Sequence, residues 1–182
     1  MGARGWIGNL RRWGADARGV AAIEFALVVP FLLILYFGGY EATEASSAYR
    51  KMSDVTVELG EVTAQYTTMS AADVQNVFAA SSQIMAPYPT AKLTIVLSEI
   101  TTNASSNATV TWSQAYQGGS ALAVGAPFTL PAGMAAANTS YIFVQTSYTW
   151  TPGFQDNFVS NVPMTDQYYM IPRNSASIPY TG

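Results

Sequence analysis

The sequence predicts an α+β protein with a long N-terminal membrane helix, a short second helix, and a small antiparallel sheet of three to four strands. Three observations support this fold class. A run of 21 mostly apolar residues stands near the N-terminus, at 20–40. Apolar residues then recur at steps of three and four as far as Tyr66, which is typical of a helix with one buried face. After Pro89 the pattern changes to alternation, which is typical of half-buried strands.

The composition limits the functions that the chain can have. Its 182 residues include no cysteine and no histidine, so disulfides, thiolate metal sites and thiol nucleophiles are excluded. Histidine is also the commonest metal ligand and a frequent general base. Only 10% of the residues are charged while 13% are aromatic, which suits burial against a membrane or other subunits. We therefore expect a protein that is not an enzyme and that binds no metal and no cofactor.

Charge is distributed unevenly along the chain. Residues 1–19 form a basic leader with a net charge of +3, from four arginines and one aspartate (Arg4, Arg11, Arg12, Arg18 and Asp16). The rest of the chain holds four basic and ten acidic residues, a net charge of −6. A basic flank before a single apolar span predicts a cytoplasmic leader and an exported C-terminal part. The acidic exported part lacks the basic surface that nucleic acid requires.

The apolar run from Val20 to Tyr40 matches the ~20 residues that a helix needs to cross a bilayer. Its most apolar part includes Phe31, Leu33 and Leu35. Pro30 should bend this helix or loosen one turn, because proline removes a backbone donor. Glu24 is the unexpected residue, since a carboxylate inside a membrane is costly and usually has a partner and a function.

The helix is expected to continue beyond the membrane, over about 41–66, as one rod of ~70 Å from Val20. One apolar stripe runs along this part, formed by Ala45, Tyr49, Met52, Val55, Leu59, Val62 and Tyr66. The opposite side carries Asp54, Glu58, Glu61 and Gln65. We expect the stripe to pack on the exported domain itself, in preference to a coiled coil, and Gly60 to weaken the helix locally.

A second helix is predicted at about 71–86. Ser70 and Asp73 have the spacing of a capping box, with aspartate in place of the usual Glu or Gln. Pro87 and Pro89 end the helix. Its buried face is expected to consist of Val74, Val77, Phe78, Ser81, Ile84 and Met85.

The sheet is predicted within about 92–173. Alternating apolar and polar residues indicate four strands, at Lys92–Thr101, Asn107–Tyr116, Thr139–Pro152 and, as an edge strand closed by Pro172, Asp166–Arg173. Whether three or four of them pair stays open, as does the position of the Gly- and Ala-rich loop at 118–138. The whole of 41–182 is expected to form one periplasmic domain.

The residues around Glu24 have a recognisable spacing. Gly19 ends the basic leader, Val20 follows, and Glu24 is the fifth residue after the glycine, with Phe25 next. This pattern, followed by a spanning helix, resembles the processing motif of type IV prepilins.

The longer stretch GVAAIEFALVVPFLLILYFGGYEAT is similar to the TadE family of pseudopilins from tight-adherence (Flp) pilus systems. That family shows an E-F/Y-A-L-x-x-P run, an apolar stretch, and then glycine and glutamate. Looser matches follow in the same order, at TLPAG, SYIFVQTSYTWTP and IPR. TadF and the longer TadG type share the same N-terminus, and the length of this chain favours a TadE-like or TadF-like subunit.

The resemblance implies a function and a set of partners. Prepilin peptidase would cut between Gly19 and Val20, and Glu24, Phe25 and Pro30 would serve subunit assembly. The Glu24 carboxylate would pair with the Val20 amine of a neighbouring subunit. The protein would be a minor pilin that initiates or caps the pilus, together with the major Flp pilin, a TadF-like sister subunit and the inner-membrane assembly platform. It would cross the bacterial inner membrane once, with its C-terminal domain in the periplasm or in the extracellular pilus.

Other interpretations stay open at this point. An uncleaved signal anchor on a periplasmic domain of unrelated binding or adhesive function explains the span, but not Glu24. A secretory signal cut near Ala45 or Ala48 requires an apolar region longer than usual. Asp54, Glu58 and Glu61 could be taken for a catalytic carboxylate or metal cluster, although such spacings are more typical of a solvated helix face.

Overall fold

The computed structural model describes residues 17–153 and 160–182. The chain divides into two compact units, Met1–Thr43 and Glu44–Gly182. Helix α2 (Ala17–Thr63) begins in the first unit and ends in the second. Residues 1–16, which hold most of the predicted basic leader, lie outside the described residues.

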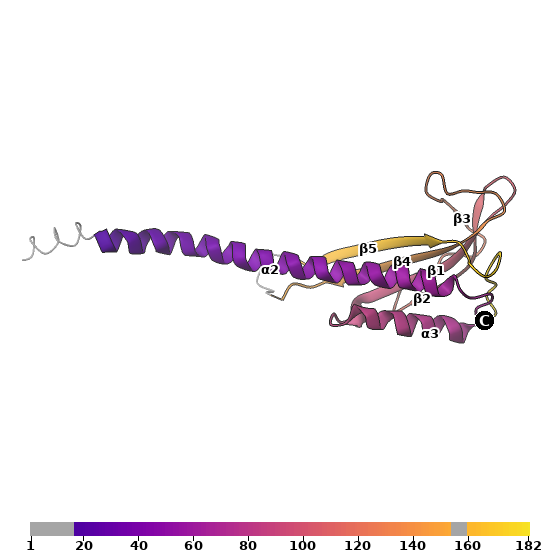
Figure 1. Ribbon diagram of the computed structural model, residues 1–182, viewed down its shortest axis with the longest axis horizontal. Coiled ribbons are helices and arrows are strands. Elements are labelled where there is room, and N and C mark those ends of the chain that lie inside the picture. Colours follow the sequence, from indigo (N-terminus) through magenta and orange to yellow (C-terminus); the bar gives the residue numbers. More distant parts are fainter. Residues whose placement is uncertain (1–16, 154–159) are drawn as a thin grey trace, which may run out of the picture. The chain divides into compact units, whose positions relative to one another are not determined.

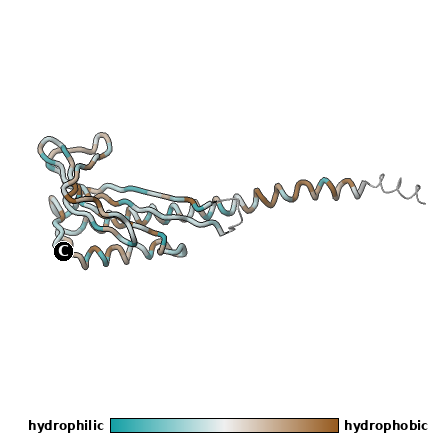
Figure 2. The backbone as a smooth tube through the Cα atoms, turned by 180° about the vertical axis from the view of Figure 1, so that it is seen from behind, coloured by the Kyte–Doolittle hydropathy of each residue, from teal (hydrophilic) through white to brown (hydrophobic). Residues whose placement is uncertain are grey.

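In the first unit, the described residues form the N-terminal part of α2. Pro30 lies inside the helix without interrupting it. Hydrophobic residues dominate this part of the chain, as the colouring of Figure 2 shows. The predicted long apolar N-terminal helix is therefore confirmed.

The second unit contains an antiparallel sheet of five strands in the order β3-β2-β1-β4-β5 (Figure 1). The strands are β1 (Leu93–Thr102), β2 (Ala108–Tyr116), β3 (Pro127–Phe128), β4 (Ser140–Trp150) and β5 (Val162–Met170). The α+β class is confirmed, but the expected number of three to four strands is wrong. The additional strand is β3, which has two residues and therefore no alternation that the sequence could reveal.

The remaining element boundaries differ by a few residues from the predicted ones. α2 ends at Thr63, and α3 (Ala71–Ser82) passes into the 3₁₀ turn η1 (Gln83–Met85). A second 3₁₀ turn, η2 (Thr90–Lys92), leads into β1. β5 begins at Val162, four residues before the predicted start, because Val162 and Met164 continue the alternation and pack against the core.

The main core lies between the two helices and one face of the sheet, which we call the helix face. Met52, Val55 and Leu59 of α2 are fully buried, as is Phe78 of α3. The sheet contributes mainly Leu93, Ile95, Leu97, Trp112, Ile142, Val144, Tyr148 and Trp150. The predicted packing of the α2 stripe on its own domain is confirmed for these three α2 residues.

One member of the predicted stripe is placed wrongly by the sequence pattern. Tyr49 is 43% exposed, and Ala48 is fully buried instead. The buried series is therefore Ala48, Met52, Val55 and Leu59, with steps of four, three and four. A small residue at this position lets the helix lie close to its neighbours, while the larger tyrosine remains on the flank.

The loop at 118–138 covers part of the opposite face of the sheet, which we call the outer face. Phe128 packs on Phe143 with ring centroids 5.0 Å apart, and Phe143 packs on Tyr169 at the same distance. Leu122, Leu130 and Met134 of the loop complete this smaller cluster. The sheet is thus covered by helices on one face and partly by this loop on the other.

The start of α3 and the end of α2 are both capped by hydrogen bonds. The predicted capping box is present, because the Ser70 amide donates to Asp73 Oδ2 at 2.9 Å and the Asp73 amide donates to Ser70 Oγ at 3.2 Å. Beyond the end of α2, the Arg173 amide donates to the Ala64 carbonyl at 2.8 Å. The Asn174 side chain donates to the Gln65 carbonyl, also at 2.8 Å. The segment after β5 therefore caps α2.

Candidate functional site

The N-terminal part of α2 is the most unusual surface of the described chain. It is long and apolar enough to be a membrane anchor or a signal sequence, and none of its most apolar window is buried. Phe31 and Leu35 are each 73% exposed, and Phe25 is 68% exposed. Val20, Leu33 and Tyr40 of the predicted span are exposed as well. Apolar area of this extent needs a lipid or protein environment, because water does not solvate it favourably.

Glu24 lies on this surface with its side chain exposed. Among the described residues it has no hydrogen-bond or ion-pair partner in the chain. Val20 and Glu24 are four residues apart and so lie on the same side of the helix. Within 17–153 and 160–182, therefore, no side chain neutralises this carboxylate.

The surroundings of the predicted cleavage point are open. Gly19 is the third residue of α2, and a Cβ added to it would meet no atom within 4 Å. Packing in the described chain therefore does not require glycine at this position. Pro30, the third predicted assembly residue after Glu24 and Phe25, is exposed on the same helix.

The three α2 carboxylates that the sequence groups together, Asp54, Glu58 and Glu61, do not converge on one point. Glu61 forms an ion pair with Arg173 and accepts a hydrogen bond from the Tyr168 hydroxyl at 3.3 Å. Burial, and then the nearby Glu61, raise the pKa of Tyr168, so this phenol stays protonated and remains a donor. Asp54 and Glu58 are exposed. The described residues contain no group of three acidic side chains that could hold a metal ion.

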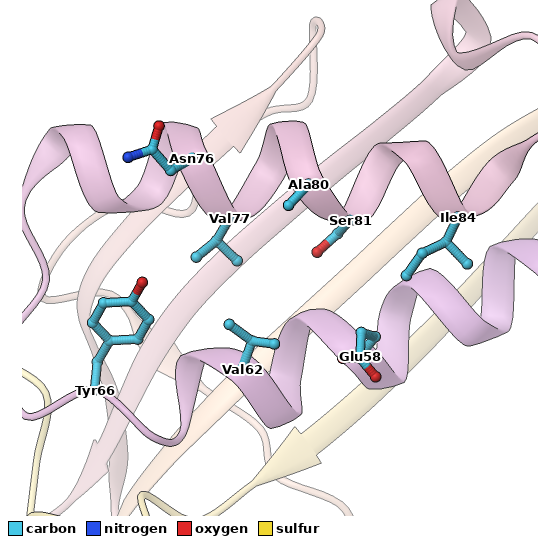
Figure 3. Close-up of a pocket in the computed structure, with 8 residues that line it drawn as sticks. All are labelled: Glu58, Val62, Tyr66, Asn76, Val77, Ala80, Ser81 and Ile84. Atoms are coloured by element: carbon cyan, nitrogen blue, oxygen red, sulfur yellow. The ribbon is translucent and has the colours of Figure 1, made fainter.

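A groove of about 360 Å³ lies between α2 and α3 (Figure 3). Val62 of α2 and Val77 of α3 point toward one another across it, while Asn76 points away (Figure 3). Its charged wall is Glu58 alone, beside the polar Ser81 and Tyr66. No general acid and base face each other among the residues that line this groove, so they do not form a catalytic arrangement.

A second hollow, of about 540 Å³, lies where the start of α2 in the second unit meets the segment after η1. Arg50, Lys51 and Asp54 line it together with Tyr49 and Tyr88. Arg50 is exposed and donates to Ser47 Oγ at 3.1 Å. Charges of both signs border this hollow, so it does not select anions or cations clearly.

One buried polar cluster was not predicted from the sequence. Glu99 of β1 is fully buried on the helix face and accepts hydrogen bonds from the Ser140 hydroxyl and, at 2.7 Å, from the Ile178 amide. Trp112 Nε1 donates to the Ile178 carbonyl at 2.7 Å. The signal was present, because Glu99 continues the series Leu93, Ile95 and Leu97 at every second position. A carboxylate at a core position indicates a buried polar contact.

The second unit also has a long stretch without charge. No charged residue occurs between Glu99 and Asp156, and this stretch contains β2, β3, the loop at 118–138 and β4. In an average globular chain about a quarter of the residues are charged. These elements therefore present only uncharged side chains, among them the aromatic Phe128 and Phe143 on the outer face of the sheet.

Comparison with known proteins gives no relative from which a function could be transferred. The chain matches none of the protein-family models, none of the curated proteins and none of the solved structures with which it was compared.

Proposed function

We propose that the protein is a non-enzymatic minor pilin of the tight-adherence type, which initiates or caps a pilus at the bacterial inner membrane. One observation carries the proposal. Glu24 lies on an exposed apolar helix, five residues after the glycine that ends a basic leader, and it has no partner among the residues that the structure describes. A signal anchor needs the apolar length and the basic flank, but it does not need this carboxylate.

In this proposal the helix acts through its packing in a bundle. Prepilin peptidase removes the leader after Gly19 and leaves a cationic amine on Val20. Phe25 and the apolar residues after it pack among helices of the major pilin. Glu24 pairs with the Val20 amine of a neighbouring subunit. A subunit that is displaced along the bundle axis would separate these two buried charges, and an unpaired buried charge is costly. A buried ion pair of this kind contributes to register more than to stability.

The uncharged stretch of the second unit, between Glu99 and Asp156, supports the same proposal. A chargeless stretch of this length disfavours free diffusion and suits contact with other subunits, such as a TadF-like sister pilin. Catalysis is not part of the proposal, because Glu61 is held in an ion pair while Asp54 and Glu58 are exposed apart from it. The proposed location is a single pass through the inner membrane, with 41–182 in the periplasm.

Amino-terminal sequencing of the protein recovered from membranes is the first test. A start at Val20 supports the proposal. A start at Met1 supports the competing function, a signal-anchored periplasmic domain for binding or adhesion. A start near Ser46 would instead indicate a secreted protein.

The second test is Glu24→Gln, which removes the charge and keeps the shape. We expect the variant to be folded, inserted and cleaved, while the number of pili per cell falls sharply. Asp54→Asn, on the exposed side of α2 in the second unit, is the matched control and should leave piliation unchanged. Normal piliation with Glu24→Gln contradicts the pairing, and normal piliation after deletion of the gene contradicts the proposed function.

A further inference from the structure

The last nine residues, 174–182, form a segment that we call the C-terminal strap. It has no helix, and its only strand-like contact is a parallel bridge between Met69 and Tyr180. The strap lies across the end of the core, beside the start of α3, and it is held in a specific way.

The site under the strap binds main-chain atoms. Glu99 accepts from the Ile178 amide and Trp112 donates to the Ile178 carbonyl, both at 2.7 Å. Met69 extends the same pattern, because its amide donates to the Pro179 carbonyl at 3.0 Å and its carbonyl accepts from the Thr181 amide at 2.8 Å. Four hydrogen bonds thus hold the main chain of the strap, through the carbonyls of Ile178 and Pro179 and the amides of Ile178 and Thr181. This is how proteins bind an extended peptide.

One side chain of the strap supplies the apolar anchor. Ile178 is fully buried and belongs to the main core cluster. Five of the other eight residues are exposed (Asn174, Ala176, Pro179, Thr181 and Gly182). Tyr180 packs on Trp112 with ring centroids 5.7 Å apart. A segment with a single buried anchor opens more easily than the sheet beneath it.

We propose that Glu99, Trp112 and Met69 form a peptide-binding site that takes the C-terminal strap of a second copy of this chain in exchange for its own. When the strap leaves, the Trp112 indole loses its acceptor and the Glu99 carboxylate keeps only the Ser140 hydroxyl, so an empty site is unfavourable. The strap of another copy restores every one of these contacts, because it has the same sequence.

The exchange has a natural hinge. The chain before the strap is fixed to the end of α2 by the Arg173 amide and side chain, and no regular element lies between Arg173 and Ile178. Asn174 is also held, because its side chain donates to the Gln65 carbonyl. The part of the strap beyond Asn174 can therefore swing while the sheet and both helices keep their structure. Exchange of an identical segment between copies is a low-cost route to linked subunits. The inference does not depend on the proposed role in a pilus.

Disulfide trapping in membranes tests the exchange, because the chain has no cysteine of its own. A Cβ added to Gly182 would lie 2.9 Å from the Ala71 Cβ and 2.5 Å from the Tyr180 hydroxyl. The tip of the Tyr180 side chain must therefore move aside, and the two Cβ atoms must separate by about 1 Å to reach the spacing of a disulfide. Two full-length copies with different tags are coexpressed, one with Ala71→Cys and one with Gly182→Cys. After mild oxidation we expect a disulfide-linked dimer that carries both tags.

Two controls make the result specific. Gln83→Cys replaces Ala71→Cys in the collision control, because Gln83 is exposed and lies roughly 18 Å away at the other end of α3. We expect at least fivefold less dimer from that pair.

The second control changes the strap itself. In the Gly182→Cys copy, Ile178→Asp should abolish the dimer, whereas the exposed Ala176→Asp should leave it unchanged. A yield no higher than the Gln83 pair overturns the proposal, and so does a yield that Ile178→Asp does not lower. The double variant Ala71→Cys/Gly182→Cys should form an intrachain disulfide. This bond shows that the two cysteines can react when the strap occupies its site.

Discussion

At the scale of single residues, Gly60 sets how closely α2 approaches the sheet. A Cβ at this position would lie 2.7 Å from Tyr168 Cδ1 and 3.6 Å from Val144 Cγ2. Gly60→Ala gains up to about 1 kcal/mol of helix propensity but overpacks the contact with Tyr168, which costs about 1–3 kcal/mol. We expect a net loss of unfolding free energy of about 1 kcal/mol, measured by urea denaturation in detergent.

The control for this prediction is the same Gly60→Ala substitution made in a protein that also carries Tyr168→Ala. In the Tyr168→Ala background the ring is absent, and Gly60→Ala should then stabilise the protein. A double-mutant cycle without coupling between the two positions would show that the close approach is not what requires glycine.

Leu59 tests the core at the same scale. Leu59→Ala should lower the unfolding free energy by about 2–5 kcal/mol, since the side chain is fully buried between α2 and the helix face. Val57→Ala, two residues away and 37% exposed, should change it by less than about 0.5 kcal/mol. Equal melting temperatures for the wild type and Leu59→Ala would contradict the described packing.

At the scale of elements, the start of α3 makes stability depend on pH. The Ser70 hydroxyl, and then its amide, hold the pKa of Asp73 below its usual value of about 4. Because the folded-state pKa is lowered, this contribution to stability is present above about pH 4 and is lost as the pH falls through the lowered pKa. Ser70→Ala should therefore reduce the unfolding free energy at pH 7 and flatten its loss as the pH falls below about 4. An unchanged slope would contradict the role of the capping box.

The elements differ in how far the sequence alone could predict them. The long α2 helix and the four longer strands follow from periods of 3.6 and 2 over nine or more residues, and the capping box follows from the spacing of Ser70 and Asp73. The two residues of β3 and the strap have no period, because pairing partners elsewhere in the chain determine their conformation. For the candidate site, Gly19 and Glu24 could be found by their spacing. The buried contacts of Glu99 could not, since they depend on Ile178, 79 residues away.

At the scale of the whole molecule, the orientation across the membrane is open to direct measurement. The four arginines of the leader precede a single apolar span, so we expect the leader in the cytoplasm and residues after about Tyr40 in the periplasm. A reporter that is active only in the periplasm should work when fused after Gly182. Activity of a cytoplasmic reporter at that position, with silence of the periplasmic one, would contradict this orientation.

The strand order also determines how the exported part can fold. Three of the four strand pairs (β1 with β2, β2 with β3 and β4 with β5) join strands that follow one another along the chain. The fourth pair, β1 with β4, joins residues as far apart as Leu93 and Tyr148. Such distant pairing forms slowly, because a long loop must close first. A nascent chain in which β4 has not yet been delivered therefore exposes the edge of β1, where a neighbouring chain could pair with it. The yield of refolding should consequently fall as protein concentration rises. For the same reason, export of one chain at a time, with few unfolded copies nearby, favours the native sheet.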